Sequence, residues 1–523
     1  MDLTITRAPF RDADDSKSAS AVTSRVTTLS TWPMALVLGI LGAALGFIGS
    51  WVPSYWGDEA ATVLSADRSW SSLARELTVI DGVHGLYYSG MHVWIHLFGT
   101  SELSTRLPSA IAAGVMVAGV VTLVRQFAGI RLAALAGVVA ILLPRATSMA
   151  MEARSYAAGA AAAVWLTVLL VRALRSRGSR WAWVAYAFCA AAALYLFLYL
   201  GLLLLAHGVY VAVAHWRHLR QWGASASAAM LLAAPIIVVG FLQRNQISFL
   251  GRRHYATSTN VLVRQWFGSS LVAVVAWSLI VAAAGWAALA LLDRRRAGGA
   301  HVSHRRVIEL IGLTLLWLVM PTGILLGVDA LGVPAYNTRY LAFSTPAAAI
   351  LIAAGTAALV SQIAHRGRRL AATAAVIVSL IGVAAPVYIA QRQPYAKDGG
   401  SDLRAVAAYV GSHAEAGGSV IFDQTTKPSR DPRLAIDLYP AQFTQLDDIA
   451  LVRPAASRAA IWDEVVPNRA ALAQAPAGSD VWAVELRKGS ATPEDISMLQ
   501  SMGYSVASAD LIHRTTVYHL VKG

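Results

Sequence analysis

The feature that most constrains the fold of this chain is a series of eleven apolar runs, each long enough to cross a bilayer. A helix needs about 20 predominantly apolar residues to span the hydrocarbon core. Hydrophobic residues make up 56% of the 523 positions and charged residues only 14%, a balance that ordinary soluble domains do not reach. We therefore predict a polytopic α-helical membrane protein. The expected helices cover residues 33–52, 107–126, 131–149, 154–173, 181–197, 198–216, 224–242, 269–292, 307–327, 341–363 and 369–390.

The basic residues between these runs fall in alternate loops. Cytoplasmic loops of membrane proteins carry an excess of lysine and arginine. The N-terminus is therefore expected in the cytoplasm, and everything after the eleventh helix is expected outside. The clusters that set this orientation are Arg125 with Arg131, Arg172 to Arg180, Arg217 with Arg220, Arg294 to Arg306, and Arg366 to Arg369.

Three segments follow from this topology. Residues 1–32 are rich in Ser, Thr, Asp and Arg and have no apolar face, so we expect a disordered cytoplasmic tail. Residues 33–392 form the transmembrane domain, and its first outer loop covers residues 53–106. Residues 393–523 gain Asp, Glu, Lys and Pro and alternate strand-like with helix-like runs, which predicts a small extracytoplasmic α/β domain.

Charge and cysteine content exclude two classes of function. The net charge of +14 does not indicate nucleic-acid binding, because the basic residues lie in the short clusters that set topology. Cys189 is the only cysteine and lies inside an apolar run, which excludes an intrachain disulfide and a multi-cysteine metal site.

An acidic pair, Asp58 and Glu59, stands just after the first apolar run, on the face expected to be outside. Carboxylates at such a position in so apolar a chain favour a catalytic role, although a solvated loop end remains the alternative. Further along this loop, residues 70–80 form an amphipathic stretch that suits the membrane interface.

Aromatic and titratable residues gather in the rest of the first outer loop. His84, Tyr87, Tyr88 and Trp94 suit a site for a lipid-linked substrate at the membrane surface, and they equally suit an interfacial aromatic girdle. Arg106 is open to the same two interpretations, since a basic residue before a helix also marks a membrane boundary.

Five short motifs follow one another along the chain on the expected outer face, and a sixth stands at the start of the outer domain. They are Trp56-Gly57-Asp58-Glu59, His84-Gly85-Leu86-Tyr87-Tyr88, Arg106-Leu107-Pro108-Ser109, Met151-Glu152-Ala153-Arg154-Ser155-Tyr156, Asn337-Thr338-Arg339-Tyr340-Leu341 followed by Pro346, and Asp402-Leu403-Arg404-Ala405-Val406-Ala407. In this set the chain resembles the GT-C membrane glycosyltransferases. It is most similar to the branch that holds the protein O-mannosyltransferases and the lipid A aminoarabinose transferases.

One motif departs from the family pattern. Members of the family commonly carry His-Pro-Pro-Leu-Tyr-Tyr, whereas this chain has His84-Gly85-Leu86, which is one residue shorter and lacks proline. Glycine frees the backbone that two prolines would stiffen, so the placement of His84 is not fixed by the resemblance.

The resemblance implies a GT-C fold and inverting transfer of a sugar, with mannose favoured, from a polyprenyl-phosphate donor. The acceptor would be a cell-envelope glycan, a glycolipid or a protein at the outer face of a bacterial plasma (inner) membrane. The alternative from another class is a membrane transporter or a lipid or glycolipid flippase. Against it, charged residues cluster in outer loops and at helix ends rather than at helix midpoints.

The resemblance also implies roles for individual residues. Asp58 is the expected catalytic base, and Glu59 is expected to bind the acceptor or to orient Asp58. No cofactor or metal ligand is assigned, and use of a divalent cation is left open. The expected ligands of the donor phosphate are Arg154 and Arg339 by motif, and Arg252, Arg253 and Arg264 by their charge in an outer loop. The remaining substrate-binding candidates are His84, Tyr87, Tyr88, Glu152, Tyr156 and Tyr340, and Glu152 is expected to pair with one of the arginines.

Overall fold

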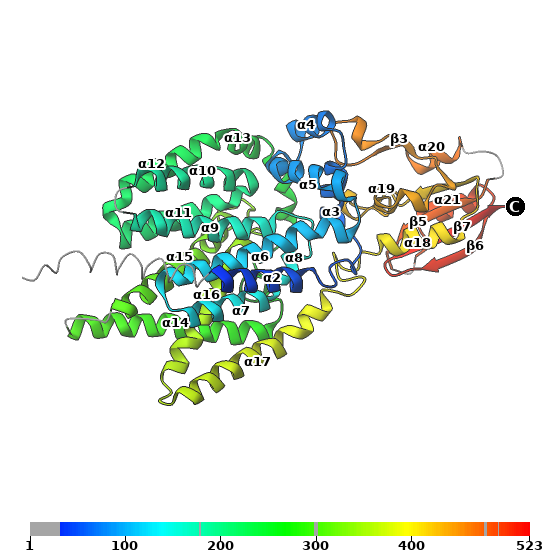
Figure 1. The fold of residues 1–523 in the computed structure, drawn as a ribbon. Helices are drawn as coiled ribbons and strands as arrows, with labels where there is room; N and C mark the ends of the chain where they lie inside the picture. Colours follow the sequence, from blue (N-terminus) through cyan, green and yellow to red (C-terminus); the bar gives the residue numbers. More distant parts are fainter. Residues whose placement is uncertain (1–31, 177–178, 298–301, 475–478, 490) are drawn as a thin grey trace, which may run out of the picture.

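The computed structural model describes residues 32–176, 179–297, 302–474, 479–489 and 491–523. The expected cytoplasmic tail, apart from its last residue, lies outside the described residues. A bundle of long helices lies beside a smaller sheet domain at the C-terminal end of the chain, and the short helices of the first outer loop cover the end of the bundle that faces the sheet (Figure 1).

Within the described residues, each of the eleven apolar runs contains a helix, and two of the runs are each broken into a pair of helices. The helices are α2 (Trp32–Phe47), α6 (Glu102–Phe127), α7 (Ile130–Leu142), α8 (Pro144–Ala150), α9 (Tyr156–Arg175), α10 (Arg180–Leu196), α11 (Gly201–Ala214), α12 (Leu219–Leu232), α13 (Ala234–Leu242), α14 (Ser270–Ala297), α15 (Val302–Ala330), α16 (Thr345–Ser361) and α17 (Arg366–Ala390).

The number of membrane spans that these helices support is smaller than eleven. Within the described residues, six helices are long and apolar enough to cross a membrane, or up to eight if each bent pair is one span. Three further apolar helices, α2, α10 and α11, are shorter than a full span. The chain is thus mostly helical with six to eight candidate spans, and the count of eleven stays a prediction.

The two bends fall where proline or its surroundings interrupt the helical hydrogen bonds. Helix α7 meets α8 at 61°, and Pro144 is the first residue of α8. Helix α12 meets α13 at 57°, and Pro235 stands in the first turn of α13. Proline donates no backbone hydrogen bond and fits the first turn of a helix, so each break is encoded locally. The first bend carries the chain toward the motif at residues 151–156.

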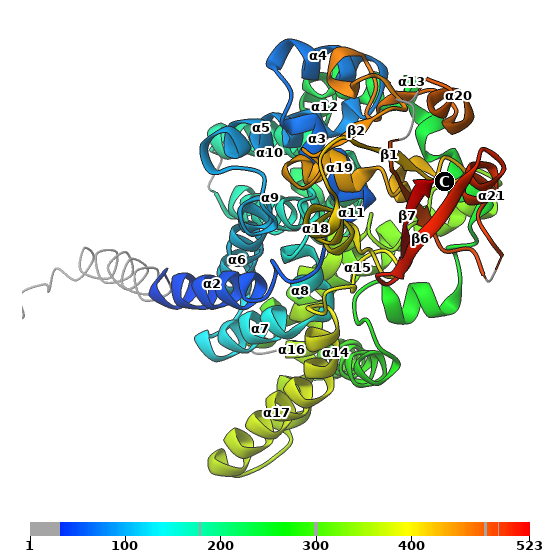
Figure 2. The same cartoon turned by 90° about the vertical axis from the view of Figure 1, so that its right-hand side faces the viewer.

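Close contacts between helices depend on small residues. Helix α6 packs along α2, and a Cβ added at Gly114 would come within 2.5 Å of the carbonyl oxygen of Gly39. Such small residues let membrane helices approach closely. Helix α16 is almost entirely buried, whereas α17 is mostly exposed and extends away from the rest of the bundle (Figure 2).

The first outer loop is folded into short helices. Ser69 and Ser101 cap α4 and α6 by accepting a hydrogen bond from the backbone three residues on. Helix α4 coincides with the amphipathic stretch expected at residues 70–80. The elements of this loop are α3 (Gly57–Ala66), α4 (Trp70–Val79), η1 (Gly82–His84) and α5 (Gly85–Phe98).

Shorter turns connect the remaining helices of the bundle. They are the 3₁₀ segments η2 (Leu198–Leu200), η3 (Trp216–His218), η4 (Arg244–Arg252) and η6 (Ala342–Ser344), and the π-helical turn η5 (Asn260–Arg264).

The C-terminal domain is built on a five-stranded sheet with the order β2-β1-β5-β7-β6. The first three strands are parallel, and β7 and β6 run antiparallel to their neighbours. The expected α/β alternation is therefore present. The strands are β1 (Gly418–Phe422), β2 (Leu446–Asp448), β5 (Val481–Leu486), β6 (Tyr504–Leu511) and β7 (Thr515–Lys522), with a separate hairpin of β3 (Leu451–Arg453) and β4 (Glu464–Val465).

Alternate residues of the central strands enter two separate cores. Val420 and Val484 pack against α18, whereas Ile421 and Ala483 pack against α21. Successive side chains of a strand point to opposite faces of the sheet, so a strand that is covered on both faces contributes to two cores. The helical elements are α18 (Leu403–His413), α19 (Leu434–Leu438), α20 (Asn468–Leu472), α21 (Glu494–Ser501), and the 3₁₀ turns η7 (Pro428–Arg430), η8 (Pro440–Gln442) and η9 (Ala455–Ser457).

Candidate active site

A cavity of about 850 Å³ lies between the bundle and the sheet domain. Its walls come from the first outer loop, the membrane helices, η4 and two loops of the sheet domain. It therefore joins an apolar surface on the side of the helices to a charged surface on the side of the sheet domain. Its lining includes Trp56, Asp58, His84, Arg154, Tyr156, Leu198, Leu202, Arg252, Arg253, Leu325, Arg339, Tyr340, Lys427, Arg430 and Trp462.

Asp58 stands in the first turn of α3, with its carboxylate in this cavity. Nη1 of Arg339 donates a hydrogen bond of 2.6 Å to Oδ2 of Asp58. The Arg339 guanidinium also lies over the Trp56 ring, 4.4 Å from its centre. The side chains of Asp58 and Arg339 are 33% and 30% exposed, so the pair is accessible from the cavity. The free N–H groups at the start of α3 favour a carboxylate at this position.

Glu59 has a different environment from its neighbour. Its carboxylate accepts hydrogen bonds of 2.8 and 2.6 Å from Nε and Nη2 of Arg106, and one of 2.9 Å from the backbone N–H of Ala153. Both side chains are fully buried, and neither lines the cavity. Glu59 is therefore placed to hold α3 against α6, and its position does not support a direct role in acceptor binding.

Arg154 is fixed on the cavity wall by a network of hydrogen bonds. Nη1 donates to the backbone oxygen of Asp58 at 3.2 Å and to the Tyr88 hydroxyl at 3.1 Å. The Tyr88 hydroxyl donates in turn to Oδ2 of Asp81 at 2.7 Å. Arg154 is thus tied to the helix that carries the candidate base. Tyr88 and Tyr87 are buried behind the wall and do not line either cavity, unlike their expected role at the substrate.

His84 lies on the cavity wall beside Arg154. Burial and the neighbouring Arg154 guanidinium lower the pKa of His84 to about 4. Nη2 of Arg154 lies 3.3 Å from Nε2 of His84, and a guanidinium only donates, so Nε2 accepts. The glycine that replaces the family prolines has φ −54°, which any residue adopts. Gly85 is therefore not needed for its conformational freedom, and His84 is held by η1 and its partner.

The expected phosphate ligands do not all reach the site. Arg154, Arg252, Arg253 and Arg339 line the cavity. Arg264 does not, and its Nη1 donates to Oδ1 of Asn260 at 3.4 Å within η5. The expectation for Arg264 rested on loop charge alone, which gives no direction to a side chain.

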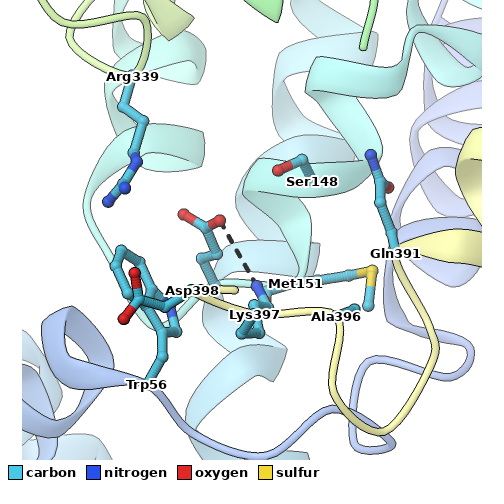
Figure 3. Close-up of a pocket in the computed structure, with 9 residues that line it drawn as sticks. Trp56, Ser148, Met151, Arg339, Gln391, Ala396, Lys397 and Asp398 are labelled. Carbon is cyan, nitrogen blue, oxygen red and sulfur yellow. Dashed lines mark hydrogen bonds and ion pairs between the residues drawn. The ribbon is translucent and has the colours of Figure 1, made fainter. Parts of the chain in front are cut away.

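A second cavity of about 140 Å³ adjoins the first, and Trp56, Arg339 and Asp398 line both (Figure 3). Glu152 lies in the smaller cavity and pairs with Nζ of Lys397 at 3.5 Å. Burial acts to raise the pKa of Glu152, but Lys397 and Arg339 together hold it below its usual range. The partner of Glu152 is thus a lysine from the segment after α17, and the expected arginine partner was wrong.

Two tyrosines of the expected set lie on the apolar side of the large cavity. Tyr340 stacks on Tyr199, with ring centres 4.6 Å apart, and Tyr156 packs against Phe197 with centres 6.0 Å apart. Both line the cavity. Across the described parts of the chain, no three His, Cys, Asp or Glu side chains are grouped as ligands of a metal ion.

Sequence reasoning allowed the outer domain to cap the cavity or to select the acceptor, but it did not identify the residues that this domain contributes. Lys427, Arg430 and Trp462 line it, although they follow the bundle by tens of residues. The available signal was Gly57, since a Cβ there would overlap the carbonyl oxygen of Ser429. Close approach of another backbone is one of the reasons for which a position requires glycine.

No protein-family model and no curated protein matches the chain. Solved structures do. ArnT from Cupriavidus metallidurans, bound to undecaprenyl phosphate, is 12% identical with a TM-score of 0.53, and the match covers 92% of this chain and 97% of that one. The apo form of ArnT gives a TM-score of 0.51 at 12% identity, with coverage of 94% and 98%.

A second enzyme has a similar fold. The Archaeoglobus fulgidus oligosaccharyltransferase, in complex with Zn and sulfate, is 10% identical with a TM-score of 0.50, and the match covers 87% of this chain and 68% of that one. At these identities the likeness establishes the fold alone. The chain therefore shares the fold of ArnT over nearly its whole length.

Proposed function

We propose that the chain is an inverting glycosyltransferase that uses a polyprenyl-phosphate sugar as donor. The acceptor is a glycan, a glycolipid or a protein of the cell envelope, and mannose is the first sugar to test. The chain is then a multi-pass protein of a bacterial plasma membrane, with its N-terminus in the cytoplasm and its sheet domain outside. Undecaprenyl phosphate, which is bound in the ArnT structure, has the chemistry of such a donor lipid.

The observation that carries this proposal is the Asp58–Arg339 pair in a cavity with one apolar side and one cationic side. Leu198, Leu202 and Leu325 supply apolar surface suited to a lipid chain. Arg339 and Arg154 supply guanidinium groups suited to its phosphate. Asp58 supplies a carboxylate that an acceptor in this cavity can reach.

The reaction needs one base and one stabiliser of negative charge. The acceptor oxygen attacks the anomeric carbon and forms the new glycosidic bond, while its proton passes to Asp58. The bond between the anomeric carbon and the phosphate oxygen breaks, and its electron pair leaves with the lipid phosphate. Arg339 stabilises the charge that develops on this phosphate. Attack from the side opposite the leaving group inverts the anomeric centre.

The test measures transfer of labelled sugar from a panel of undecaprenyl-phosphate sugars to membrane acceptors by the purified, folded protein. We expect Asp58→Asn to lose transfer while it still binds the donor. Asp67→Asn is the matched control, because Asp67 is an exposed residue at the end of α3 that lines neither cavity.

Two outcomes would reject the proposal. One is wild-type protein that transfers no sugar from any donor, and the other is Asp58→Asn with full activity. Movement of a labelled donor across vesicle membranes, without any product, would instead favour a flippase.

A further inference from the structure

Two loops of the sheet domain form the outer wall of the large cavity. One follows β1 and carries η7, and the other joins β3 to β4. They contribute Lys427, Ile461 and Trp462 to the lining. The first loop leaves the carboxyl end of a strand in the parallel part of the sheet, which is the edge where α/β domains bind their ligands.

This wall is held rigidly against the first outer loop. Nη2 of Arg68 donates to the backbone oxygen of Ala460 at 2.6 Å, and Arg68 is itself buried and paired with Glu76 at 3.0 Å. On the other loop, the carbonyl oxygen of Ser429 packs so closely on Gly57 that no side chain fits there. The side chains on the wall are thus preorganised with respect to α3, which carries Asp58.

The cationic groups around the cavity differ in whether a partner already holds them. Arg430 donates to both carboxylate oxygens of Asp398, at 2.8 and 3.0 Å. Arg339 is paired with Asp58. The exposed side chains of Lys427 and of Arg252, by contrast, make no hydrogen bond or ion pair with any of the described residues, and of the two only Lys427 lies on the wall formed by the sheet domain. Lys427 is therefore available to a ligand, and the half-buried indole of Trp462 borders the same cavity.

Inversion requires donor and acceptor to approach the anomeric carbon from opposite sides, so only one of them contacts the wall formed by the sheet domain. The donor chain needs the apolar side of the cavity, next to the membrane helices. The acceptor hydroxyl approaches the anomeric carbon from the opposite side, which is the side of the sheet domain. An ammonium recognises an anionic group, and a flat indole packs against a sugar ring.

From this arrangement we infer that Lys427 and Trp462 form an acceptor subsite for a glycan that carries an anionic group. The group is a phosphate or a carboxylate on the sugar that is glycosylated or on its neighbour. This inference rests on the proposed function and adds the class of the acceptor.

The first measurement is binding without donor. Methyl mannobioside, its 6-phosphate and its 6-carboxylate are titrated against the purified full chain. We expect at least one anionic form to bind about tenfold more tightly than the neutral form, which corresponds to about 1.4 kcal/mol. The phosphate and carboxylate forms distinguish the two sources of negative charge.

The variants locate this preference. Lys427→Glu is expected to abolish it and Lys427→Arg to retain it, while Trp462→Ala weakens neutral and anionic forms together. Lys522→Glu is the matched control, since Lys522 carries the same charge at the end of β7 and lines neither cavity. In transfer assays the Lys427 and Trp462 variants raise the KM for acceptor and leave the KM for donor unchanged.

Equal binding of the three probes by wild type, or a preference that survives Lys427→Glu, would overturn the inference while transfer activity still stands. Better transfer to serine-containing peptides than to any glycan would also overturn it. Absence of transfer from every donor would reject the proposed function itself, which the binding experiment does not depend on.

Discussion

Two neighbouring carboxylates of α3 face opposite environments. Glu59 and Arg106 form an ion pair that is fully buried, and Ala153 supplies a further backbone hydrogen bond. Asp58 and Arg339 form a pair of the same kind, with the same shortest distance of 2.6 Å, but each side chain is about one third exposed. The buried pair can only hold helices together, whereas the open pair can exchange its partner for a substrate.

The largest expected effect belongs to the buried pair. Arg106→Gln leaves the Glu59 carboxylate charged and unpaired in the protein interior, which costs roughly 3–5 kcal/mol of folding free energy. The loss of stability is measured by heating the purified protein in detergent and quantifying, by size-exclusion chromatography, the fraction that stays folded at each temperature. Arg75→Gln, at an exposed position of α4, is the control. A variant as stable as wild type would remove the structural role assigned to this pair.

The open pair is expected to affect the reaction and not the fold. In the proposed mechanism Arg339 stabilises the leaving phosphate, so Arg339→Gln is expected to lower the transfer rate by roughly 10²–10³. Arg339→Lys keeps the charge without the planar fork and recovers part of the rate. Unfolding temperatures of both variants stay near that of wild type. Unfolding of Arg339→Gln would show that the two pairs do not differ as described.

A third carboxyl, that of Glu485, sharpens the comparison because it forms no ion pair with any of the described residues, although Lys488 acts weakly to lower its pKa. Burial, with Asp495 and Asp423 nearby, raises the pKa of Glu485 on β5 from 4.5 to about 9. Between these values the folded state binds more protons than the unfolded state, so the sheet domain loses stability as pH rises, by up to about 1.4 kcal/mol per pH unit.

Hydrogen exchange of β5 at pH 6 and pH 8, corrected for intrinsic rates, measures this slope. Glu485→Gln is expected to flatten it, and Glu494→Gln, at an exposed site of α21, is expected to keep it. A slope unchanged in Glu485→Gln would assign the dependence to another group.

The smallest effect is expected at His84. Its pKa of about 4 leaves it neutral at physiological pH, so glutamine can replace it as an acceptor for Arg154. His84→Gln should lower transfer by less than about tenfold and leave the pH–rate profile between pH 6 and 8 unchanged. Disappearance of an ionisation in that range would mean that His84 titrates during the reaction.

The sequence predicted the helices better than it predicted the site. Apolar length located every helical segment of the bundle, but the two bends were not predicted, and residues 131–149 and 224–242 were each expected as one helix. The contact of Asp58 with Arg339, 281 residues apart, was not predicted, because no local pattern encodes it; the resemblance gave the two residues separate roles, as base and as phosphate ligand. The division between Asp58 and Glu59 was available from helix geometry, since adjacent residues on a helix point to different faces.

The sheet domain was harder to place. Its strands follow from local alternation, but nothing in Lys427 or Trp462 signals that their loops border a cavity built largely by the bundle. Contacts between separately folded parts depend on how their surfaces fit, and local propensity carries no information about that fit.

The contact between Gly57 and Ser429 has a consequence for how such proteins can be recombined. A hybrid that joins this bundle to the sheet domain of a protein with the same fold would have to match the foreign loop to the bare backbone at Gly57. Where the loop is longer or bulkier, α3 would shift and take Asp58 with it. Exchange of acceptor preference by domain transplantation therefore requires the glycine and the loop to be moved as one unit.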